Sequence, residues 1–272
     1  MNAVAIGPLV FSNARFQAVL AIFVFLAVVE LIAWRWPRHA QDARPWSILA
    51  LLSWIGAARL GFVGAEWDSF AAAPLDVLAL WQGGFDPLAG LAGFGVVTLL
   101  GTLRRPSVAA PLLAAAACAG IAVAGARLAL PDEASGRLPE IALPDLSGRP
   151  VPLTDAEGRP VVINLWASWC PPCRREMPMM MEVATARDDA AVRFANQRER
   201  AATISDFLRR QGLASDAVLR DPDGRLMERF DLLGLPSTLF FDAEGRLEAV
   251  HTGEISRAQL NARIDDLTRE TP

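Results

Sequence analysis

Two cysteines separated by two prolines are the residues of this chain best suited to chemistry. Cys170 and Cys173 follow an apolar run of strand length, 161–166, and precede residues 174–187, which we expect to form a helix. A thiol at the N-terminus of a helix lies beside unpaired backbone N–H groups and the positive end of the helix dipole, which stabilise a thiolate. Cys173, one turn further on, is placed to attack Cys170 when it is joined to a substrate sulfur. The spacing therefore predicts thiol–disulfide exchange.

Composition narrows the functional classes. The chain has 272 residues, is 53% hydrophobic and has a net charge of −4, and all of its basic residues are arginine. The C-terminal half is acidic and holds no basic run, which argues against nucleic-acid binding. His39 and His251 lie far apart with no cluster of cysteine or carboxylate at ligand spacing, so we expect no metal site. The redox-active disulfide Cys170–Cys173 is expected to need no further cofactor.

Four apolar runs in the first 130 residues have the length of membrane spans. About 20 apolar residues cross the hydrocarbon core of a bilayer as a helix. A cleaved signal peptide is the alternative for the first run, but no basic segment precedes it, the run is too long, and no small-residue cleavage site follows it. We therefore predict transmembrane helices over residues 16–34, 46–63, 88–103 and 108–130.

The arginines predict the orientation of these spans. They gather in the loops after the first and third spans, whereas residues 64–87 between the second and third hold four acids and no basic residue. The positive-inside rule places the arginine-bearing loops in the cytoplasm and both termini on the opposite side. We expect a bacterial inner-membrane protein whose C-terminal domain lies in the periplasm, an oxidising compartment. The loop arginines are Arg35, Arg38, Arg44, Arg104 and Arg105.

Three residues within the spans are unusual for a membrane. Charged residues in spans often mark function, although Arg59 and Arg127 lie near span ends, where a long side chain can also reach the interface. Cys118 is alone in the fourth span and is expected to be a small packing residue. A thiol relay needs a pair of cysteines, so a separate membrane electron donor is expected to reduce the Cys170–Cys173 pair.

The rest of the chain alternates strands with helices. A short polar linker, 131–140, precedes a globular domain over 141–272, and the domain over 1–130 is the membrane part. Alternating elements that close on a hairpin predict an α/β sandwich. Expected strands are 141–143, 151–153, 161–166, 191–195, 218–220, 237–241 and 247–251, and expected helices are 174–187, 203–211, 224–231 and 256–268.

The globular domain resembles the thioredoxin superfamily. Residues 164–176, NLWASWCPPCRRE, and 234–238, GLPST, carry the resemblance, which is to the membrane-anchored TlpA/ResA-like reductases and covers about 138–270. It implies a thioredoxin-like fold with a cis peptide before Pro236. It also implies a groove for a protein disulfide substrate, formed by Trp169, Pro171, Pro172, Leu235 and Pro236. The alternatives are a zinc knuckle for the two cysteines, an edge-strand start at Pro236, and a binding module without catalysis.

Glu176 lies three residues beyond Cys173, one helical turn along. In ResA-like reductases a glutamate at this place is held to tune the cysteine pKa and to move protons, so the resemblance implies a catalytic role. A solvated helix residue is the alternative. Asn164 stands where thioredoxin carries a buried acid, which leaves the proton relay to Glu176 or water. Disulfides of exported proteins, in cytochrome c or metal-centre assembly, are the substrates that the resemblance implies.

The membrane part resembles prolipoprotein diacylglyceryl transferase over about residues 5–103. Residues 57–63, AARLGFV, and 74–84, PLDVLALWQGG, carry this resemblance, which implies a membrane-lipid partner and a headgroup role for Arg59. The histidine of that family's His-Gly-Gly is Leu88 here, and its later helices are missing. Without the histidine, no evident group takes a proton from a thiol nucleophile. We therefore predict an anchor, with lipid or lipoprotein binding, or transferase-like activity, as the alternative function.

Overall fold

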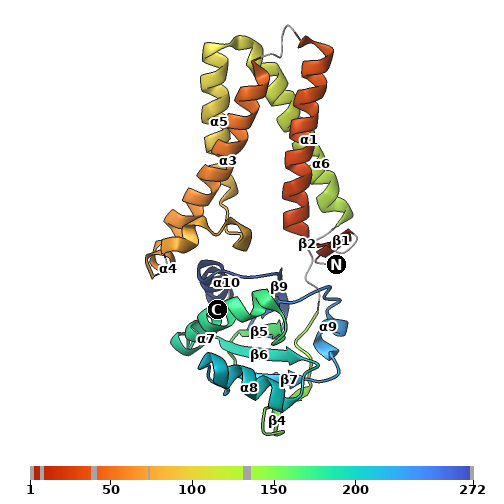
Figure 1. Cartoon of the computed structure of the whole chain (residues 1–272), viewed down its shortest axis with the longest axis vertical. Coiled ribbons are helices and arrows are strands. Elements are labelled where there is room, and N and C mark those ends of the chain that lie inside the picture. The colour runs from red at the N-terminus through yellow and green to blue at the C-terminus, as the bar shows by residue number, and fades with distance from the viewer. Residues whose placement is uncertain (1–2, 7–8, 38–41, 73, 131–135, 270–272) are drawn as a thin grey trace. The chain divides into compact units, whose positions relative to one another are not determined.

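A computed structural model describes residues 3–6, 9–37, 42–72, 74–130 and 136–269, and these form two compact units. One unit is helical and comprises residues 13–131. The other contains residues 132–272 together with residues 1–12 (Figure 1).

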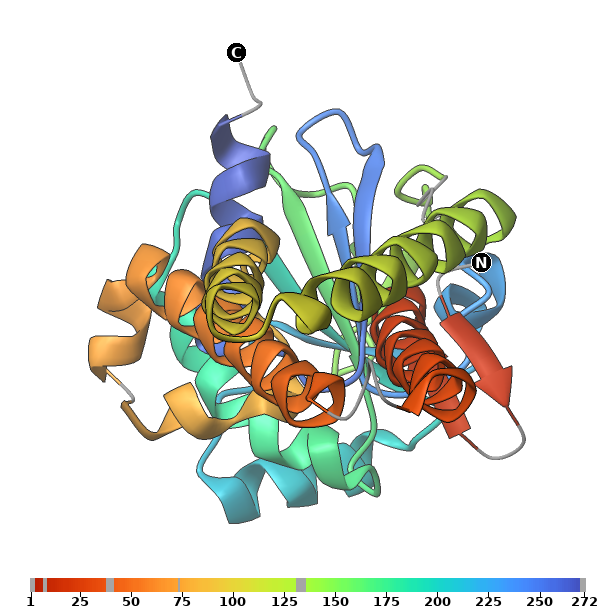
Figure 2. The ribbon, with the colours of Figure 1, turned by 90° about the horizontal axis from the view of Figure 1, so that it is seen from above.

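The helical unit contains four long helices, α1 (Asn13–Arg35), α3 (Ala43–Ala65), α5 (Pro87–Arg104) and α6 (Ala109–Ala129). All four are long and apolar enough to cross a membrane, the last together with the 3-10 turn η3 (Pro106–Val108), which confirms the predicted helical fold. α1 packs against α6 and α3 against α5 (Figure 2). Residues of all four helices meet in one apolar cluster that includes Phe25, Ala50, Phe94 and Leu112.

Small residues allow α3 and α5 to approach closely. A Cβ added to Gly61 would lie 2.4 Å from the Cβ of Ala89, and one added to Gly93 would lie 2.7 Å from the carbonyl oxygen of Ser53. The Ser53 hydroxyl also donates to the Gly93 carbonyl at 3.0 Å. A larger side chain at either glycine would therefore separate the two helices.

The elements between α3 and α5 were not predicted from the sequence. This connection contains α4 (Trp67–Ala72) and the 3-10 turns η1 (Pro74–Leu78) and η2 (Leu80–Gln82). Cys118 is exposed on α6, so the prediction that it is a packing residue is wrong. The buried side chains of α6 include those of Leu112, Ala115 and Ala119, but not that of Cys118.

The second unit is built on a five-stranded sheet with strand order β7-β6-β5-β8-β9. β5 pairs in parallel with β6 and antiparallel with β8, which confirms an α/β fold with a thioredoxin-like central sheet. The strands are β5 (Val161–Trp166), β6 (Ala191–Gln197), β7 (Val218–Asp221), β8 (Ser237–Phe241) and β9 (Leu247–Thr252). Two separate antiparallel pairs are β3 (Ala142–Pro144) with β4 (Pro150–Pro152) and β1 (Ala3–Ile6) with β2 (Leu9–Ser12), and the sequence did not predict the latter.

β5 is the centre of this unit because all six of its residues are buried. Side chains alternate along a strand, so Val162 and Trp166 enter one apolar cluster while Ile163 and Leu165 enter another. The first cluster also receives residues from α7 (Pro171–Ala186), α8 (Ala201–Gln211) and α10 (Arg257–Arg269). The second receives residues from β3 and from α9 (Arg225–Arg229).

α7 begins three residues earlier than predicted. Cys170 is its N-cap residue, and the two prolines that follow occupy its first positions. A proline is well tolerated there because the N–H it lacks has no partner within the helix. The early start places Cys170 at the tip of the helix and Cys173 within its first turn.

Candidate active site

Strand direction brings the two sequence motifs to one end of the sheet. β5 ends just before the cysteines, and its neighbour β8 runs the opposite way and begins just after Pro236. The end of β5 and the start of β8 therefore lie side by side. The peptide between Leu235 and Pro236 is cis, which confirms the expectation drawn from the thioredoxin resemblance.

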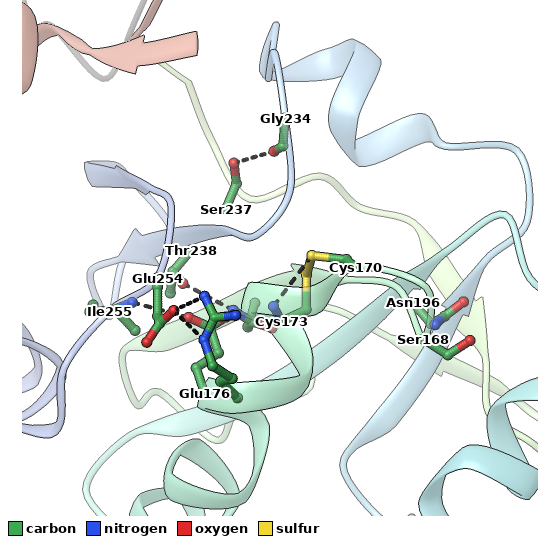
Figure 3. The surroundings of a disulfide bond; sticks show 12 residues. Ser168, Cys170, Cys173, Glu176, Asn196, Gly234, Ser237, Thr238, Glu254 and Ile255 are labelled. Atoms are coloured by element: carbon green, nitrogen blue, oxygen red, sulfur yellow. Dashed lines mark hydrogen bonds and ion pairs between the residues drawn. A yellow bond between two sulfur atoms is a disulfide. The ribbon is translucent and has the colours of Figure 1, made fainter. Parts of the chain in front are cut away.

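Cys170 and Cys173 form a disulfide with an S–S distance of 2.04 Å. The backbone N–H of Cys173 donates to the Cys170 sulfur at 3.3 Å, and both residues are buried (Figure 3). The sulfur of Cys170 thus lies at the N-terminus of α7, where free N–H groups and the helix dipole favour negative charge. After reduction, the same position stabilises Cys170 as the thiolate that attacks a disulfide.

Glu176 is buried beneath the dithiol, with only 3% of its surface exposed. It is therefore not a solvated helix residue. One carboxylate oxygen accepts from the Asn164 amide at 3.0 Å and the other from the backbone N–H of Ile255 at 3.0 Å (Figure 3). Burial raises the pKa of Glu176 to about 8, against the lowering effect of these two hydrogen bonds. A carboxyl group with this pKa can both hold and release a proton near neutral pH.

Asn164 connects Glu176 to the neighbouring strand. It lies opposite Thr238 in the register of β5 and β8, and its amide also donates to the Thr238 hydroxyl at 3.2 Å. Its own amide oxygen is buried and has no hydrogen-bond partner among the described residues. Unlike a carboxylate at this position, the amide does not titrate. Glu176 is thus the ionisable member of this hydrogen-bonded group.

An ion pair covers the outer side of Glu176. Arg175 donates two hydrogen bonds to one oxygen of Glu254, at 3.0 and 2.6 Å. Glu254 directly precedes Ile255, whose backbone N–H donates to Glu176. The negative charge of Glu254 further raises the pKa of Glu176, whereas Arg175 lowers it. This pair could not be predicted from the sequence, because its members lie 79 residues apart.

A second carboxylate, missed from the sequence, fixes the segment that leads into Cys170. Glu199 accepts from the Ser168 backbone N–H at 2.7 Å and from the Ser168 hydroxyl at 2.6 Å. It also accepts from the Asn196 amide at 2.7 Å. Asn196 lies near the end of β6, which is parallel to β5. Parallel neighbouring strands end at the same edge of a sheet, so residues that follow β6 lie near residues that follow β5. The polar residues after β6 were therefore the sequence feature that could have indicated the position of Glu199.

The predicted groove residues differ in their exposure. Trp169 is 68% exposed beside the disulfide, and Pro171 is exposed as well. Pro172 and Leu235 are half-buried and Pro236 is buried. Trp169 therefore offers an apolar surface to a partner next to a sulfur that is itself buried.

Arg59 lies apart, in the helical unit. It is 3% exposed, so it does not extend to the interface as a snorkelling side chain would. Its guanidinium donates to four backbone carbonyls, those of Asp76, Val77, Gly83 and Gly84. A headgroup role for Arg59 stays a prediction, and the contacts described here use four of its five N–H groups.

Comparison with known proteins finds relatives of the C-terminal half of the chain. Residues 135–250 match the AhpC/TSA family. A crystal structure of a secreted Mycobacterium tuberculosis disulfide oxidoreductase homologous to E. coli DsbE aligns with a TM-score of 0.42 and 26% identity. The alignment covers 47% of this chain and 96% of that one.

Curated relatives also match the C-terminal half of the chain. The thiol-disulfide oxidoreductase ResA of Geobacillus thermodenitrificans is 30% identical over 131 residues, covering 47% of this chain and 75% of the relative. ResA of Halalkalibacterium halodurans is 33% identical over 120 residues, covering 43% and 68%. The thioredoxin-like protein YneN of Bacillus subtilis is 29% identical over 131 residues, covering 47% and 76%. With its Cys-Pro-Pro-Cys disulfide on a thioredoxin-like sheet, the chain belongs to the ResA-like family of thiol–disulfide oxidoreductases.

Proposed function

We propose that this enzyme is a membrane-anchored reductant for disulfides of exported proteins, with Cys170, Cys173 and Glu176 as its catalytic residues. The observation that carries the proposal is the buried Glu176, with a pKa of about 8, beneath a disulfide at a helix N-terminus. Residues 1–130 are the anchor, 131–140 the linker and 141–272 the redox domain. Trp169, Pro171, Pro172, Leu235 and Pro236 form the substrate groove.

The reaction begins from the reduced dithiol. The Cys170 thiolate attacks one sulfur of a substrate disulfide, and the other substrate sulfur leaves as a thiolate. The Cys173 thiol transfers its proton to Glu176 and attacks the Cys170 sulfur, which closes the enzyme disulfide and releases the second substrate thiolate. Two electrons have then passed from the enzyme dithiol to the substrate disulfide. A separate dithiol donor in the membrane returns the enzyme to its reduced form.

The periplasmic placement rests on the distribution of arginine. Arg44 pairs with Glu30, and Arg105 lies 3.9 Å from Asp42, so basic side chains of two connections meet at one end of the helical unit. Under the positive-inside rule this end is cytoplasmic, and the chain continues into the redox domain from the other end.

Cytochrome c and metal-centre assembly proteins, whose cysteines must be reduced before they bind a cofactor, are the substrate class that we propose.

The proposal is tested by trapping the mixed disulfide. Cys173→Ala retains the attacking sulfur and lacks the resolving one, so substrates remain attached and can be identified by mass spectrometry. The matched control is Cys170→Ala/Cys173→Ala, which should trap nothing. Capture of exported proteins with paired cysteines is expected. A Cys173→Ala variant that captures no more than the control would overturn the catalytic proposal.

The direction of electron flow has its own test. A reductant should have a potential near that of thioredoxin, about −270 mV, and a strong oxidant one near −120 mV. Equilibration of the full chain with glutathione or dithiothreitol buffers, followed by thiol counting, measures it. A potential near the second value would contradict reduction and leave the exchange chemistry intact.

A further inference from the structure

The connection between α3 and α5 folds back along α3 instead of extending beyond it. The Asp86 backbone N–H donates to the carbonyl of Ala58 at 2.9 Å, and the Arg59 side chain reaches the carbonyls of η1 and of Gly83 and Gly84. Ala58 and Arg59 precede the end of α3 by about two helical turns, or roughly 10 Å. The irregular backbone therefore runs beside the last part of a helix that has the composition of a membrane span.

Arg59 satisfies the backbone polar groups of this connection. Its four hydrogen bonds to carbonyls measure 3.0, 2.5, 3.0 and 2.6 Å. The guanidinium also lies 5.2 Å from the ring of Phe70 and 5.9 Å from that of Phe85. Water would hydrate such carbonyls in a surface loop. In a bilayer each carbonyl needs a protein donor, because irregular backbone at that depth is tolerated only where its polar groups are satisfied.

The outer side of the same connection is apolar. Trp67, Leu75, Leu78 and Trp81 are 63, 80, 73 and 65% exposed. No arginine lies between residues 60 and 103. The exposed side chains continue those of the adjoining helices, Leu60 on α3 and Leu88 and Leu91 on α5, which are 67, 77 and 61% exposed. A soluble protein rarely exposes an apolar surface of this extent, whereas tryptophan is enriched at membrane–water interfaces and leucine is favourable in the apolar part of the bilayer.

We infer that residues 67–72 and 74–82 form an interfacial element seated in the lipid bilayer at the end of α3. Leu75, Leu78 and Trp81 contact lipid, and Arg59 donates hydrogen bonds to the backbone carbonyls on the side that faces the protein. Asp68 is exposed at the start of the element and stays in water. The inference rests on the proposed membrane insertion, and its occupant is the lipid interface rather than a protein partner.

Depth measurements with a fluorophore on a single cysteine test the inference. The full chain carries Cys118→Ala, Cys170→Ser, Cys173→Ser and Leu78→Cys, is labelled with an environment-sensitive dye, and is placed in phosphatidylglycerol/phosphatidylcholine nanodiscs. Nitroxides near the headgroup or deep in the acyl chain report lipid contact, and iodide reports water. The label on Leu78→Cys should be quenched most by the shallow nitroxide and little by iodide.

Two controls separate the possible failures. A chain with only Cys170→Ser and Cys173→Ser carries the label on the native Cys118, which is exposed near the middle of α6 and should be quenched by the deep nitroxide. Ser215→Cys, exposed in the other unit, should respond to iodide alone. A Cys118 label insensitive to lipid nitroxides would overturn the membrane insertion itself.

If Cys118 behaves as expected, the label at Leu78 decides the inference. Strong iodide quenching would overturn it, because the element would then lie in water. Insensitivity to both lipid nitroxides and iodide would overturn it as well, because a second copy or another part of the chain would then cover the element.

Arg59→Met tests the part played by the guanidinium. The variant keeps a long side chain but removes all four donors, so the carbonyls must find water. The Leu78 label should lose its quenching by shallow nitroxide and gain quenching by iodide, while the Cys118 label stays deep. Arg59→Lys, which retains fewer donors, should give an intermediate result. An unchanged depth at Leu78 in Arg59→Met would overturn the role assigned to Arg59.

Discussion

Glu176 in one unit and Arg59 in the other are both buried ionisable side chains, and their contacts differ. Glu176 and Arg59 are both 3% exposed. Glu176 accepts two hydrogen bonds, lies on the first turns of the helix that carries the dithiol, and has a pKa of about 8. Arg59 donates four hydrogen bonds to backbone carbonyls. A guanidinium does not release its proton in proteins, so it can hold a structure but cannot exchange protons.

The difference shows how to interpret a buried charge. Burial alone does not mark a catalytic group, because a charge that is fully hydrogen-bonded can serve architecture. A buried group becomes a candidate for catalysis when its pKa lies near the working pH and it is close to the reacting atoms. Glu176 meets both conditions, while the contacts of Arg59 are architectural.

The largest effect is expected from Arg59→Met in the helical unit. Each buried carbonyl left without a donor costs about 1 to 3 kcal/mol, so the loss of four donors should lower the free energy of unfolding by several kcal/mol. Thermal unfolding in detergent, followed by circular dichroism, measures it, with Arg59→Lys as the milder variant. Disulfide exchange by Cys170 and Cys173 should be unchanged. A loss of exchange activity in a folded Arg59→Met protein would break the contrast between the two residues.

The pH dependence of stability should identify Glu176. Its pKa is raised from 4.5 in the unfolded chain to about 8 in the folded one, so between these values the folded protein binds one proton more. Stability should therefore fall as the pH rises through this window, by on the order of 5 kcal/mol in total. Urea unfolding of the oxidised protein at a series of pH values measures this loss. Glu176→Gln should flatten the profile, and equal slopes in both proteins would show that another group is responsible.

A smaller effect, on rate, is expected from the same substitution. If Glu176 accepts the Cys173 proton, Glu176→Gln should slow disulfide reduction by on the order of a hundredfold, because a positioned acid or base contributes about that much or more. Stopped-flow tryptophan fluorescence from pH 5 to 10 provides the measurement, in about the range where Glu176 and thiols titrate. Glu182→Gln is the matched control, since Glu182 is on the same helix and exposed. A rate that drops equally at every pH would favour a purely structural role.

The smallest effect is expected from Glu254→Gln. Removing this negative charge should lower the pKa of Glu176 slightly, because Glu254 is a minor cause of its elevation. The Arg175 guanidinium then no longer has a carboxylate partner, which favours the charged form of Glu176 in the same direction. The midpoint of the pH–rate profile should move to lower pH. A midpoint that moves to higher pH would contradict the electrostatic account.

The sequence predicted the parts that depend on local pattern. The apolar run of β5, the cysteine spacing and the four spans each carry their own signal, and the structure confirms the fold that they imply. The contacts of Glu199 with Ser168 and of Arg175 with Glu254 could not be predicted in this way, because each joins segments brought together only by the fold. Arg59 was identified as a charge within a span, but its partners are backbone carbonyls. Every residue has a backbone carbonyl, so the amino-acid sequence does not indicate which carbonyls accept hydrogen bonds from Arg59.

Cys118 has a practical consequence for stoichiometry. It is the one cysteine of the chain outside the disulfide. An oxidised molecule therefore carries one free thiol and a reduced molecule three, so a thiol count per molecule in denaturant gives the fraction reduced when the protein concentration is known. A count below one would reveal damage or cross-linking through α6, separately from the state of the active site.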